Sequence, residues 1–337
     1  MRQSLLCIMV VLLLVTFLPV RAENGKISGE VFGDYYYISQ SNNADLEGRN
    51  GFWLRRIYFT YEMKLTEKIS GRVRFEASHP DGLRSSAGKA VPFIKNAYLK
   101  WKMGNHTLYI GLVETPTWNQ IEKIWGYRSV EKTPLDLQKM GSSRDVGLAL
   151  AGKLDNNGKV NYYLTFGNGK GKESDNDKGK QVTLALGFYP AKNLYLEFYG
   201  DWNDKPENTD WFTLQGFAAY KSEKGRLGIQ FTHQTRKGNT DLNLELLSIF
   251  GAVNLSKKTA LFARVDKMFD PNPKAGDISY IPFSPEAKST LIIGGLDFKV
   301  NPKVSILPNV EVVLYDDANG NKPKSDVIPR VTFFFKF

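Results

Sequence analysis

The feature that most constrains this sequence is a series of segments in which apolar and polar side chains alternate residue by residue. The last segment, PRVTFFFKF at 329–337, places Val331 and Phe335 in one register and Arg330 and Lys336 in the other. A period of two residues is that of a β-strand with one apolar and one polar face. An aromatic strand at a chain end is prone to aggregate unless its free edge is paired. We therefore expect the final strand to pair with the first strand and to close a ring.

Segments of this kind recur along the whole chain, and helical periodicity is nearly absent. Each has about the length that a tilted strand needs to cross a bilayer, whereas no apolar stretch after residue 22 reaches the roughly 20 residues of a membrane helix. The sixteen predicted strands span 26–39, 52–65, 70–78, 94–102, 106–113, 145–153, 159–168, 181–189, 194–203, 211–221, 226–234, 242–254, 260–269, 288–300, 304–315 and 327–337.

The connections between these segments alternate between short turns and long polar loops such as 40–51, 169–180 and 270–287. Outer-membrane barrels have short periplasmic turns and long external loops, and only helices and closed barrels satisfy every backbone group in lipid. The sequence therefore predicts an all-β fold, a transmembrane antiparallel β-barrel of 16 strands with both termini on the periplasmic side. The short turns lie at 66–69, 102–106, 155–158, 190–193, 222–225 and 256–259.

The amino-terminal segment has the features of a secretory signal peptide. A basic Arg2 precedes an apolar run at 5–18, and small residues mark a cleavage site after Ala22. The alternative is a membrane anchor, for which the run is too short. We therefore expect residues 1–22 to be removed on export, which leaves a barrel domain at 23–337.

Composition excludes several classes of function. The only cysteine, Cys7, lies in the predicted signal peptide, so the exported chain has neither disulfides nor thiolate metal ligands. The formal charge is +10, and loss of Arg2 and Arg21 with no acid leaves +8, a field that favours small anions. Because no long basic run and no metal-ligand spacing occurs in the sequence, we predict no nucleic-acid partner, no metal and no cofactor.

Lipid contact decides which face of each strand points outward, since an Arg at the bilayer midplane costs about 2 to 4 kcal/mol. Charged residues should therefore face the lumen. Arg55 falls in the lipid-facing register near a strand end, from which we expect it to reach the headgroups. The lumen registers contain the basic residues that we predict to line the pore and select anions: Arg56, Lys64, Arg72, Arg74, Lys100, Arg330 and Lys336.

Rings of Arg and Lys select anions because they replace part of an anion's hydration and repel cations. With a four-residue turn between the second and third strands, Arg74 is expected to lie roughly opposite Glu62. An internal ion pair without effect on transport is the alternative interpretation of these two residues. Arg72 would then stand beside Lys64, and Arg56 would remain uncompensated.

Six segments occur in this order: GFWLRRIYFTYEMKL (51–65), GRVRFEA (71–77), NAYLKWK (96–102), LYIGLVETP (108–116), YRSVEK (127–132) and SSRDVGLALAGKL (142–154). Together they resemble the amino-terminal half of bacterial porins related to the phosphate-selective porin O and P family. The matched order covers 26–154, and the terminal Phe extends the likeness to the whole mature chain. The resemblance implies a homotrimeric sixteen-stranded channel in the outer membrane of a Gram-negative-type bacterium, with membrane lipid and small solutes as partners.

The longest loop in the first half of the chain is 114–143. In the porins that this chain resembles, the corresponding loop folds into the lumen and sets its narrowest section, so we predict a constriction loop here. A loop lying over the top of the barrel is the alternative. Trp118, Ile121, Ile124 and Trp125 are expected to pack against the wall. The charged residues expected to meet solution are Glu122, Lys123, Arg128, Glu131, Lys132 and Asp136.

The predicted function is a passive diffusion channel for small hydrophilic solutes with a bias toward anions, phosphate among them. One alternative is a barrel that takes up sugars or hydrophobic compounds, although its Tyr and Trp residues are also typical of interfacial girdles. Another is a phospholipase or protease, which needs a hydroxyl, a His and an acid near one rim. We expect His106 at the opposite rim from His79 and His233, and His233 to face lipid, so no enzyme is predicted.

Overall fold

The computed structural model describes residues 25–79, 83 and 88–337, so the predicted signal peptide at 1–22 lies outside the described residues. Within these ranges sixteen antiparallel strands form one closed barrel, which confirms the predicted fold class. Every predicted strand end lies within three residues of the observed one. The strands are β1 (Gly25–Tyr37), β2 (Asn50–Lys64), β3 (Ile69–Ser78), β4 (Val91–Met103), β5 (His106–Glu114), β6 (Arg144–Lys153), β7 (Val160–Gly167), β8 (Gln181–Ala191), β9 (Leu194–Asn203), β10 (Trp211–Lys221), β11 (Gly225–Arg236), β12 (Leu242–Asn254), β13 (Thr259–Met268), β14 (Ser289–Asn301), β15 (Val304–Tyr315) and β16 (Asp326–Lys336).

Short helices occur in the connections between strands. In the part of the chain that the structure describes, none of them is long and apolar enough to span a membrane. They are η1 (Ala44–Leu46), α2 (Pro116–Trp125), α3 (Pro134–Leu137), η3 (Pro206–Asn208) and η4 (Pro273–Asp277).

The ring closes because the last strand pairs with the first. Strand β16 lies antiparallel to β1, with Tyr36 opposite Arg330. The backbone N–H of Gly29 donates to Phe337 O at 3.1 Å, and the backbone N–H of Phe337 donates to Gly29 O at 3.0 Å. Only glycine fits at position 29 without displacement, since a Cβ there would lie 2.2 Å from the Phe337 ring. The expected closure is thereby confirmed, and both edges of the sheet are paired.

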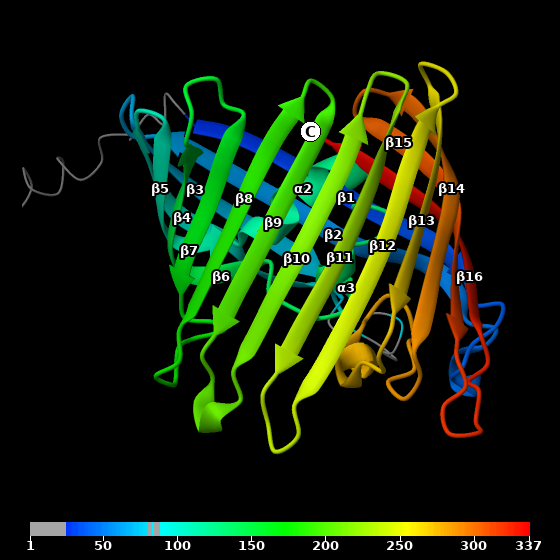
Figure 1. Ribbon diagram of the computed structural model, residues 1–337. Helices are drawn as coiled ribbons and strands as arrows, with labels where there is room; N and C mark the ends of the chain where they lie inside the picture. Colours follow the sequence, from blue (N-terminus) through cyan, green and yellow to red (C-terminus); the bar gives the residue numbers. More distant parts are fainter. Residues whose placement is uncertain (1–24, 80–82, 84–87) are drawn as a thin grey trace, which may run out of the picture.

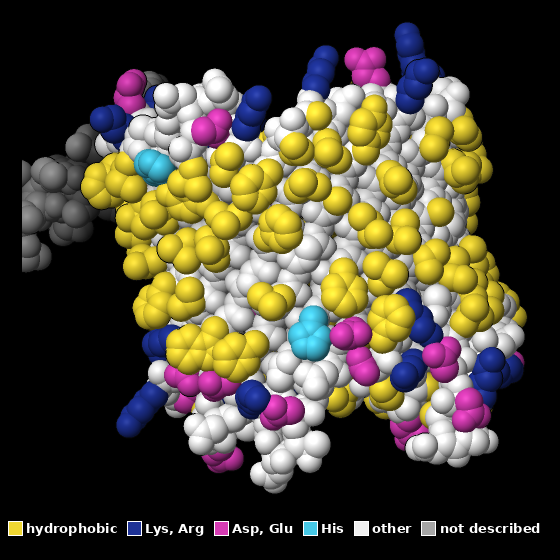
Figure 2. Space-filling view, in the orientation of Figure 1, with side chains coloured by type: hydrophobic (Ala, Val, Ile, Leu, Met, Phe, Trp, Pro, Cys, Tyr) yellow, Lys and Arg dark blue, Asp and Glu magenta, His cyan; other side chains and the backbone are white. Residues whose placement is uncertain are grey.

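Successive residues of each strand face opposite sides of the wall. In β16, Val331 and Phe335 face outward with 46% and 40% of their surface exposed, whereas Arg330 and Thr332 are buried. Figure 2 shows a broad band of hydrophobic side chains across the wall, with charged side chains concentrated toward its two edges. Lipid would cover a band of this kind in a membrane barrel.

The two ends of the barrel differ in their connections (Figure 1). Short turns join the strands at the end that is uppermost in Figure 1, where the chain also ends, and the longer loops lie at the opposite end. We call these the short-turn end and the long-loop end. The predicted alternation of short turns and long loops is confirmed.

Two segments lie inside the barrel. The first inner segment, 115–143, contains α2 and α3, and α2 is seen through the wall in Figure 1. The second inner segment, 278–284, belongs to the loop between β13 and β14, and nearly all of its residues are buried. This loop, predicted at 270–287, is therefore only partly exposed: Lys274 and Asp277 in η4 face solvent, and the chain then turns inward.

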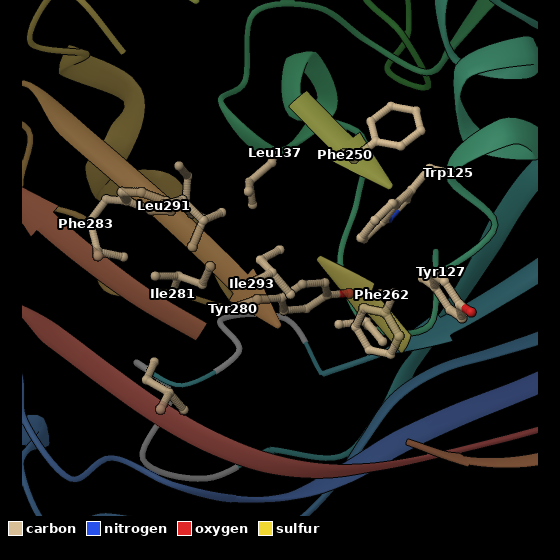
Figure 3. Packing of buried hydrophobic residues seen from close by; sticks show 14 of the residues in the cluster. Trp125, Tyr127, Leu137, Phe250, Phe262, Tyr280, Ile281, Phe283, Leu291 and Ile293 are labelled. Carbon is tan, nitrogen blue, oxygen red and sulfur yellow. The ribbon is translucent and has the colours of Figure 1, made fainter. Parts of the chain in front are cut away.

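A hydrophobic core attaches the inner segments to one side of the barrel (Figure 3). The Trp125 ring centroid lies 5.4 Å from that of Phe250 in β12, and the Tyr127 centroid lies 4.2 Å from that of Phe262 in β13. The inner face of these strands is largely apolar, apart from the buried ion pair of Arg264 with Asp266 in β13, and the burial of its apolar surface stabilises the attachment. The second inner segment and β14 add Tyr280, Ile281, Phe283, Leu291 and Ile293 to the same core.

The apolar residues predicted to pack the 114–143 loop against the wall have the following positions. Ile121, Ile124 and Trp125 are buried in this core. The side chain of Trp118 lies outside the described part of the structure.

Deletion of Phe337 tests the closure. It removes two backbone hydrogen bonds of the seam, each worth about 1 kcal/mol, together with the ring that covers Gly29. We expect a clear fall in the folded fraction, measured as the heat-modifiable band in electrophoresis. Leu255→Ala, at an exposed position outside the seam, is the control and should fold like the native chain. An unchanged folded fraction after the deletion would contradict the importance of this seam.

Candidate functional site

A cavity of about 990 Å³ lies inside the barrel, lined by the first inner segment, mainly by strands β3 to β7 of the wall, and by single residues of other strands such as Glu30 in β1 and Asp297 in β14. We call it the main cavity. Its lining is polar enough to hold water and ions, and tyrosines alternate with the charged groups. The basic residues that line it are Arg72, Arg74, Lys95, Lys100, Lys123, Arg128, Arg144 and Lys153, and the acidic ones are Glu30, Glu114, Glu122, Asp136, Glu197 and Asp297.

Two β-bulges bring additional basic residues into the interior. In β2 the register with β1 shifts at Arg55, and in β4 the register with β3 shifts at Lys95. A bulge lets two consecutive side chains face one side of the sheet. Arg55 and Arg56 are both buried in the interior, as are Lys95 and Asn96. The prediction that Arg55 faces lipid is therefore wrong, and strict alternation also misses Lys95.

A network of five buried charges joins the first inner segment to the wall. The Arg55 guanidinium lies 3.2 Å from Asp34 and 3.1 Å from Glu131. The Arg330 guanidinium lies 3.1 Å from Asp34 and 3.0 Å from Glu311. None of the five side chains has exposed surface. Removing one partner would leave a buried charge uncompensated, so the network holds the segment at one position.

This network contains two residues that were predicted to act in the pore. Glu131 was expected to meet solution, but its side chain is fully buried against Arg55. Arg330 faces the interior as expected, but it is buried between two acids and does not line the main cavity. Because both charges are compensated by partners, neither adds a free charge to the main cavity.

A second group of ion pairs connects β2, β3 and β4. Glu76 Oε2 lies 2.9 Å from Lys95 Nζ, and Glu76 also pairs with Arg56. The prediction that Arg56 remains uncompensated is therefore wrong. The prediction lacked the observed register between β2 and β3, which brings Glu76 of β3 beside the β2 bulge.

The register between β2 and β3 differs from the predicted one. Thr60 lies opposite Arg74, and Glu62 lies opposite Arg72. Arg72 forms the ion pair with Glu62, whereas Arg74 Nε donates to Thr60 Oγ1 at 2.7 Å. The expected pair of Arg74 with Glu62 is wrong, because five residues (65–69) rather than four separate the paired positions of the two strands.

Three cations of the wall, Arg74, Lys100 and Lys153, have no acidic partner within ion-pair distance among the described residues. The Arg74 guanidinium lies 5.3 Å from the ring centroid of Tyr58, and Lys100 Nζ lies 5.7 Å from that of Tyr109. Rings at these distances attract a cation through their electron-rich faces without neutralising it. Arg74 and Lys100 therefore present uncompensated positive charge to the main cavity.

A row of tyrosines runs beside these cations. Ring centroids are 5.4 Å apart between Tyr98 and Tyr109, and 6.2 Å apart between Tyr109 and Tyr163. Arg72 lies 5.7 Å from the Tyr98 ring. The wall formed by β3 to β7 thus alternates cations with aromatic rings, which we call the basic–aromatic wall.

The first inner segment presents charges of both signs to the same cavity. Glu122 and Arg128 form an ion pair at 3.3 Å, and Lys123 is exposed in the cavity. Burial alone would raise the pKa of Asp136, but Lys132 and Arg128 lower this pKa to about 2, so Asp136 is ionised. Burial lowers the pKa of Lys132 to about 7, so part of its charge is lost at neutral pH. Asp136 is therefore a fixed negative charge that faces the cavity from the side of the inner segment.

Two further basic residues of the predicted set lie away from the main cavity. Lys64 and Lys336 are exposed in the last positions of β2 and β16, at the short-turn end. Arg72 and Lys123 do line the cavity. Of the predicted pore-lining cations only Arg72, Arg74 and Lys100 line the cavity, and Lys95, Arg144 and Lys153 join them there.

The histidines are the candidate bases of an enzyme site. His106, at the short-turn end, contacts the Tyr162 hydroxyl at 2.9 Å, and His79 contacts Leu54 O at 3.0 Å. These positions agree with the expected opposite rims. Among residues with described positions, no group of three or more His, Cys, Asp or Glu side chains could hold a metal ion.

His233 lies on the outer face, with 40% of its side chain exposed, as predicted. Its ring contacts Glu245 at 3.3 Å and the Thr235 hydroxyl at 3.3 Å. This trio resembles the hydroxyl, base and acid of a hydrolase. However, the Thr235 hydroxyl donates to Asn243 at the shorter distance of 2.8 Å, so its proton is not directed at the base that would have to accept it.

No protein-family model and no curated protein sequence matches the chain. Solved structures with a similar fold include an anion-selective porin from Comamonas acidovorans, at 12% identity over 93% of this chain and 99% of that one, with a TM-score of 0.68. The outer membrane channel DcaP of Acinetobacter baumannii is 10% identical over 93% and 97%, with a TM-score of 0.65. The trimer form of OmpT, an outer membrane protein of Vibrio cholerae, is 11% identical over 93% and 99%, with a TM-score of 0.63. At these identities the likeness concerns the fold.

Replacement of Arg55 tests whether the charge network holds the inner segment. Arg55→Met leaves Glu131 buried without its cation, so we expect the free energy of unfolding in detergent to fall by about 3 kcal/mol and protease cleavage within 115–143 to increase. Arg74→Met is the matched control, because Arg74 has no acidic partner among the described residues; its loss should be within about 1 kcal/mol. Equal losses in the two variants would show that the network does not anchor the segment.

Proposed function

We propose that this protein is an outer-membrane porin, a passive channel for small hydrophilic solutes with a preference for anions. The observation that carries the proposal is a polar cavity with uncompensated Arg74 and Lys100 inside a closed barrel whose outer face is apolar. Solutes would diffuse through the cavity without chemistry, and its charges would set the preference. The likeness in fold to an anion-selective porin supports this assignment.

The segment 114–143 is the proposed constriction loop. It occupies the lumen opposite the basic–aromatic wall, and its position is held by the apolar core and by the buried charge network. Asp136 on the segment and the cations on the wall would create a field across the passage. Water confined between protein walls screens such a field less than bulk water does, so the passing ion experiences it directly.

The proposed anion preference rests on fewer residues than the sequence predicts. Arg56 and Arg72 have acidic partners, and among the described residues Arg74, Lys100, Lys123 and Lys153 are the cations of the cavity without one. Phosphate remains a proposed solute because of the resemblance to the phosphate-selective porin O and P family. The exported chain would reach the outer membrane through the predicted signal peptide, and a homotrimer is proposed because a barrel of similar fold is known in a trimer form.

A sugar-uptake barrel is the second candidate function. The observation that favours it is the row formed by Tyr98, Tyr109 and Tyr163 along the cavity, in which the rings of Tyr109 and Tyr163 stack and the ring of Tyr98 lies edge-on to that of Tyr109. Block of the ionic current by added sugars at millimolar concentration would favour this candidate, and an unaffected current would favour the ion channel.

Ion selectivity can be tested by the reversal potential of single channels in a potassium chloride gradient. We expect the sign of an anion-preferring pore for the native protein. Arg74→Glu combined with Lys100→Glu should move the reversal potential toward that of a cation-preferring pore, because two uncompensated positive charges become negative. Lys257→Glu in a short turn is the control for charge alone and should leave the potential unchanged. A cation-preferring native pore would refute the proposal.

Orientation can be tested with short epitope tags. Tags inserted at 173–177 or 273–277 lie at the long-loop end, so they should be labelled by antibody on intact cells. Tags at 155–158 or 222–225 lie at the short-turn end and should be labelled only after the outer membrane is opened. Equal labelling of the two sets on intact cells would reject the proposed orientation.

A further inference from the structure

The lysines of the chain gather at the short-turn end of the barrel. We call the seven short turns, with the last two residues of every strand at this end and Phe337, the rim. Thirteen lysines and one arginine of the rim stand against three acidic residues, which gives it a net charge of +11. The whole chain has a formal charge of +10. The entire positive excess of the protein therefore lies at one end.

The positive charge of the rim is not compensated by the protein itself. Among the described residues, none of its thirteen lysines has an acidic partner within ion-pair distance. At the long-loop end, by contrast, six lysines form ion pairs with acids, among them Lys237 with Asp241 and Lys324 with Glu47. Figure 2 shows basic side chains that project beyond the short-turn edge of the wall. Such a surface attracts a partner with many negative charges.

The lysines of the rim form two groups that face different surroundings. The six at strand ends alternate with exposed apolar residues, so they face the mouth of the barrel and not lipid. They are Lys26, Lys64, Lys102, Lys153, Lys221 and Lys336. The other seven, which we call the turn lysines, are all exposed in the turns themselves. They are Lys68, Lys159, Lys192, Lys224, Lys257, Lys258 and Lys303.

The turn lysines lie at the level where lipid headgroups begin. The outer face of the wall remains apolar up to the turns: Leu65, Leu255 and Val300 are 55%, 59% and 61% exposed, and each stands two or three residues before a turn lysine. In a bilayer, acyl chains cover such residues, so the headgroups start beside the turns. A lysine stem can lie along apolar surface while its ammonium group reaches the headgroups.

The distribution of the turn lysines fits a partner that surrounds the barrel. They occur in six of the seven short turns, so they form a ring rather than a patch on one side. A soluble protein that docks on one side would need its charges concentrated there. Membrane lipid contacts the whole circumference, as the turn lysines do.

We propose that the turn lysines bind anionic phospholipids, of the phosphatidylglycerol class, in the leaflet at the short-turn end. Ammonium groups are compact, mobile point charges, which suit an exchanging array of headgroup phosphates better than one fixed ligand. The proposal goes beyond the proposed function, because passive diffusion requires no particular lipid. The long-loop end, where six lysines are already paired, would lack this preference.

The test is lipid selection by the full mature protein, immobilised on a column in detergent micelles that contain equal amounts of phosphatidylglycerol and phosphatidylcholine. The lipids retained after washing are extracted and quantified. We expect phosphatidylglycerol to exceed phosphatidylcholine about threefold at low ionic strength, and the excess to vanish in about 1 M salt, which screens surface charge. The combined replacements Lys68→Gln, Lys224→Gln and Lys258→Gln should lower this excess about twofold.

The matched control replaces three exposed lysines of the long-loop end, with the changes Lys178→Gln, Lys274→Gln and Lys322→Gln. It has the same net charge as the rim variant, so it separates the position of the charge from its amount, and it should keep the native lipid excess. Arginine in place of the same three turn lysines should also keep the excess, because the positive charge is retained.

Each outcome decides the proposal. Absence of a phosphatidylglycerol excess on the native protein would overturn it, and so would equal losses in the rim variant and the control. Binding of isolated anionic cell-wall glycan through the turn lysines, without a lipid excess, would overturn it in favour of a polymer of the aqueous compartment.

The rim variant should fold like the native protein. Among the described contacts, the side chains of Lys68, Lys224 and Lys258 form no hydrogen bond and no ion pair, and the heat-modifiable band verifies folding. Because the assay measures bound lipid and not current, its failure is distinct from a failure of the selectivity test for the proposed channel.

Discussion

The whole structure depends on the requirement that every backbone N–H and C=O in the wall finds a partner within the sheet, because lipid offers none. In this chain the requirement is met at the seam between β1 and β16, where Gly29 and Phe337 exchange hydrogen bonds. Closure with an even number of strands brings both ends of the wall to the short-turn end. It also creates an interior that can hold two inner segments and a polar cavity at the same time.

The strands and their faces could be predicted from the sequence because their signal is local. A side-chain period of two and an apolar outer face are visible within ten residues, so the predicted strand ends agree closely with the observed ones. The bulges at Arg55 and Lys95 break this period and change the side on which a cation lies. A usable signal was present in both places: two consecutive polar residues, Arg55-Arg56 and Lys95-Asn96, within an otherwise alternating strand.

Whether each inward-facing charge has an oppositely charged partner could not be predicted, because the partner is distant in sequence. Asp34 and Arg330 are 296 residues apart, and Glu131 is 76 residues from Arg55. A pattern shows that a cation faces inward, but only the register and the path of the inner segments show whether an acid meets it. This is why Arg330 belongs to a compensated network, whereas Arg74 in the same predicted set keeps its charge for the cavity.

The interior has two tasks, which are to attach the inner segments by burial and to keep a hydrated cavity. They fall on different sides of the barrel because one surface cannot be both buried and hydrated. On the side of β12 to β14, Arg264 donates to the backbone oxygen of Lys132, but most of the attachment is apolar burial, in which Trp125 and Phe250 exclude water. Burial of this kind tolerates sliding, whereas the Arg55 network does not, since each buried charge requires its own partner at close range. The apolar core therefore supplies affinity for the inner segment and the charge network supplies its position. Only a segment held in this way can keep Asp136 at a constant distance from the opposite cations, which a field across a narrow passage requires.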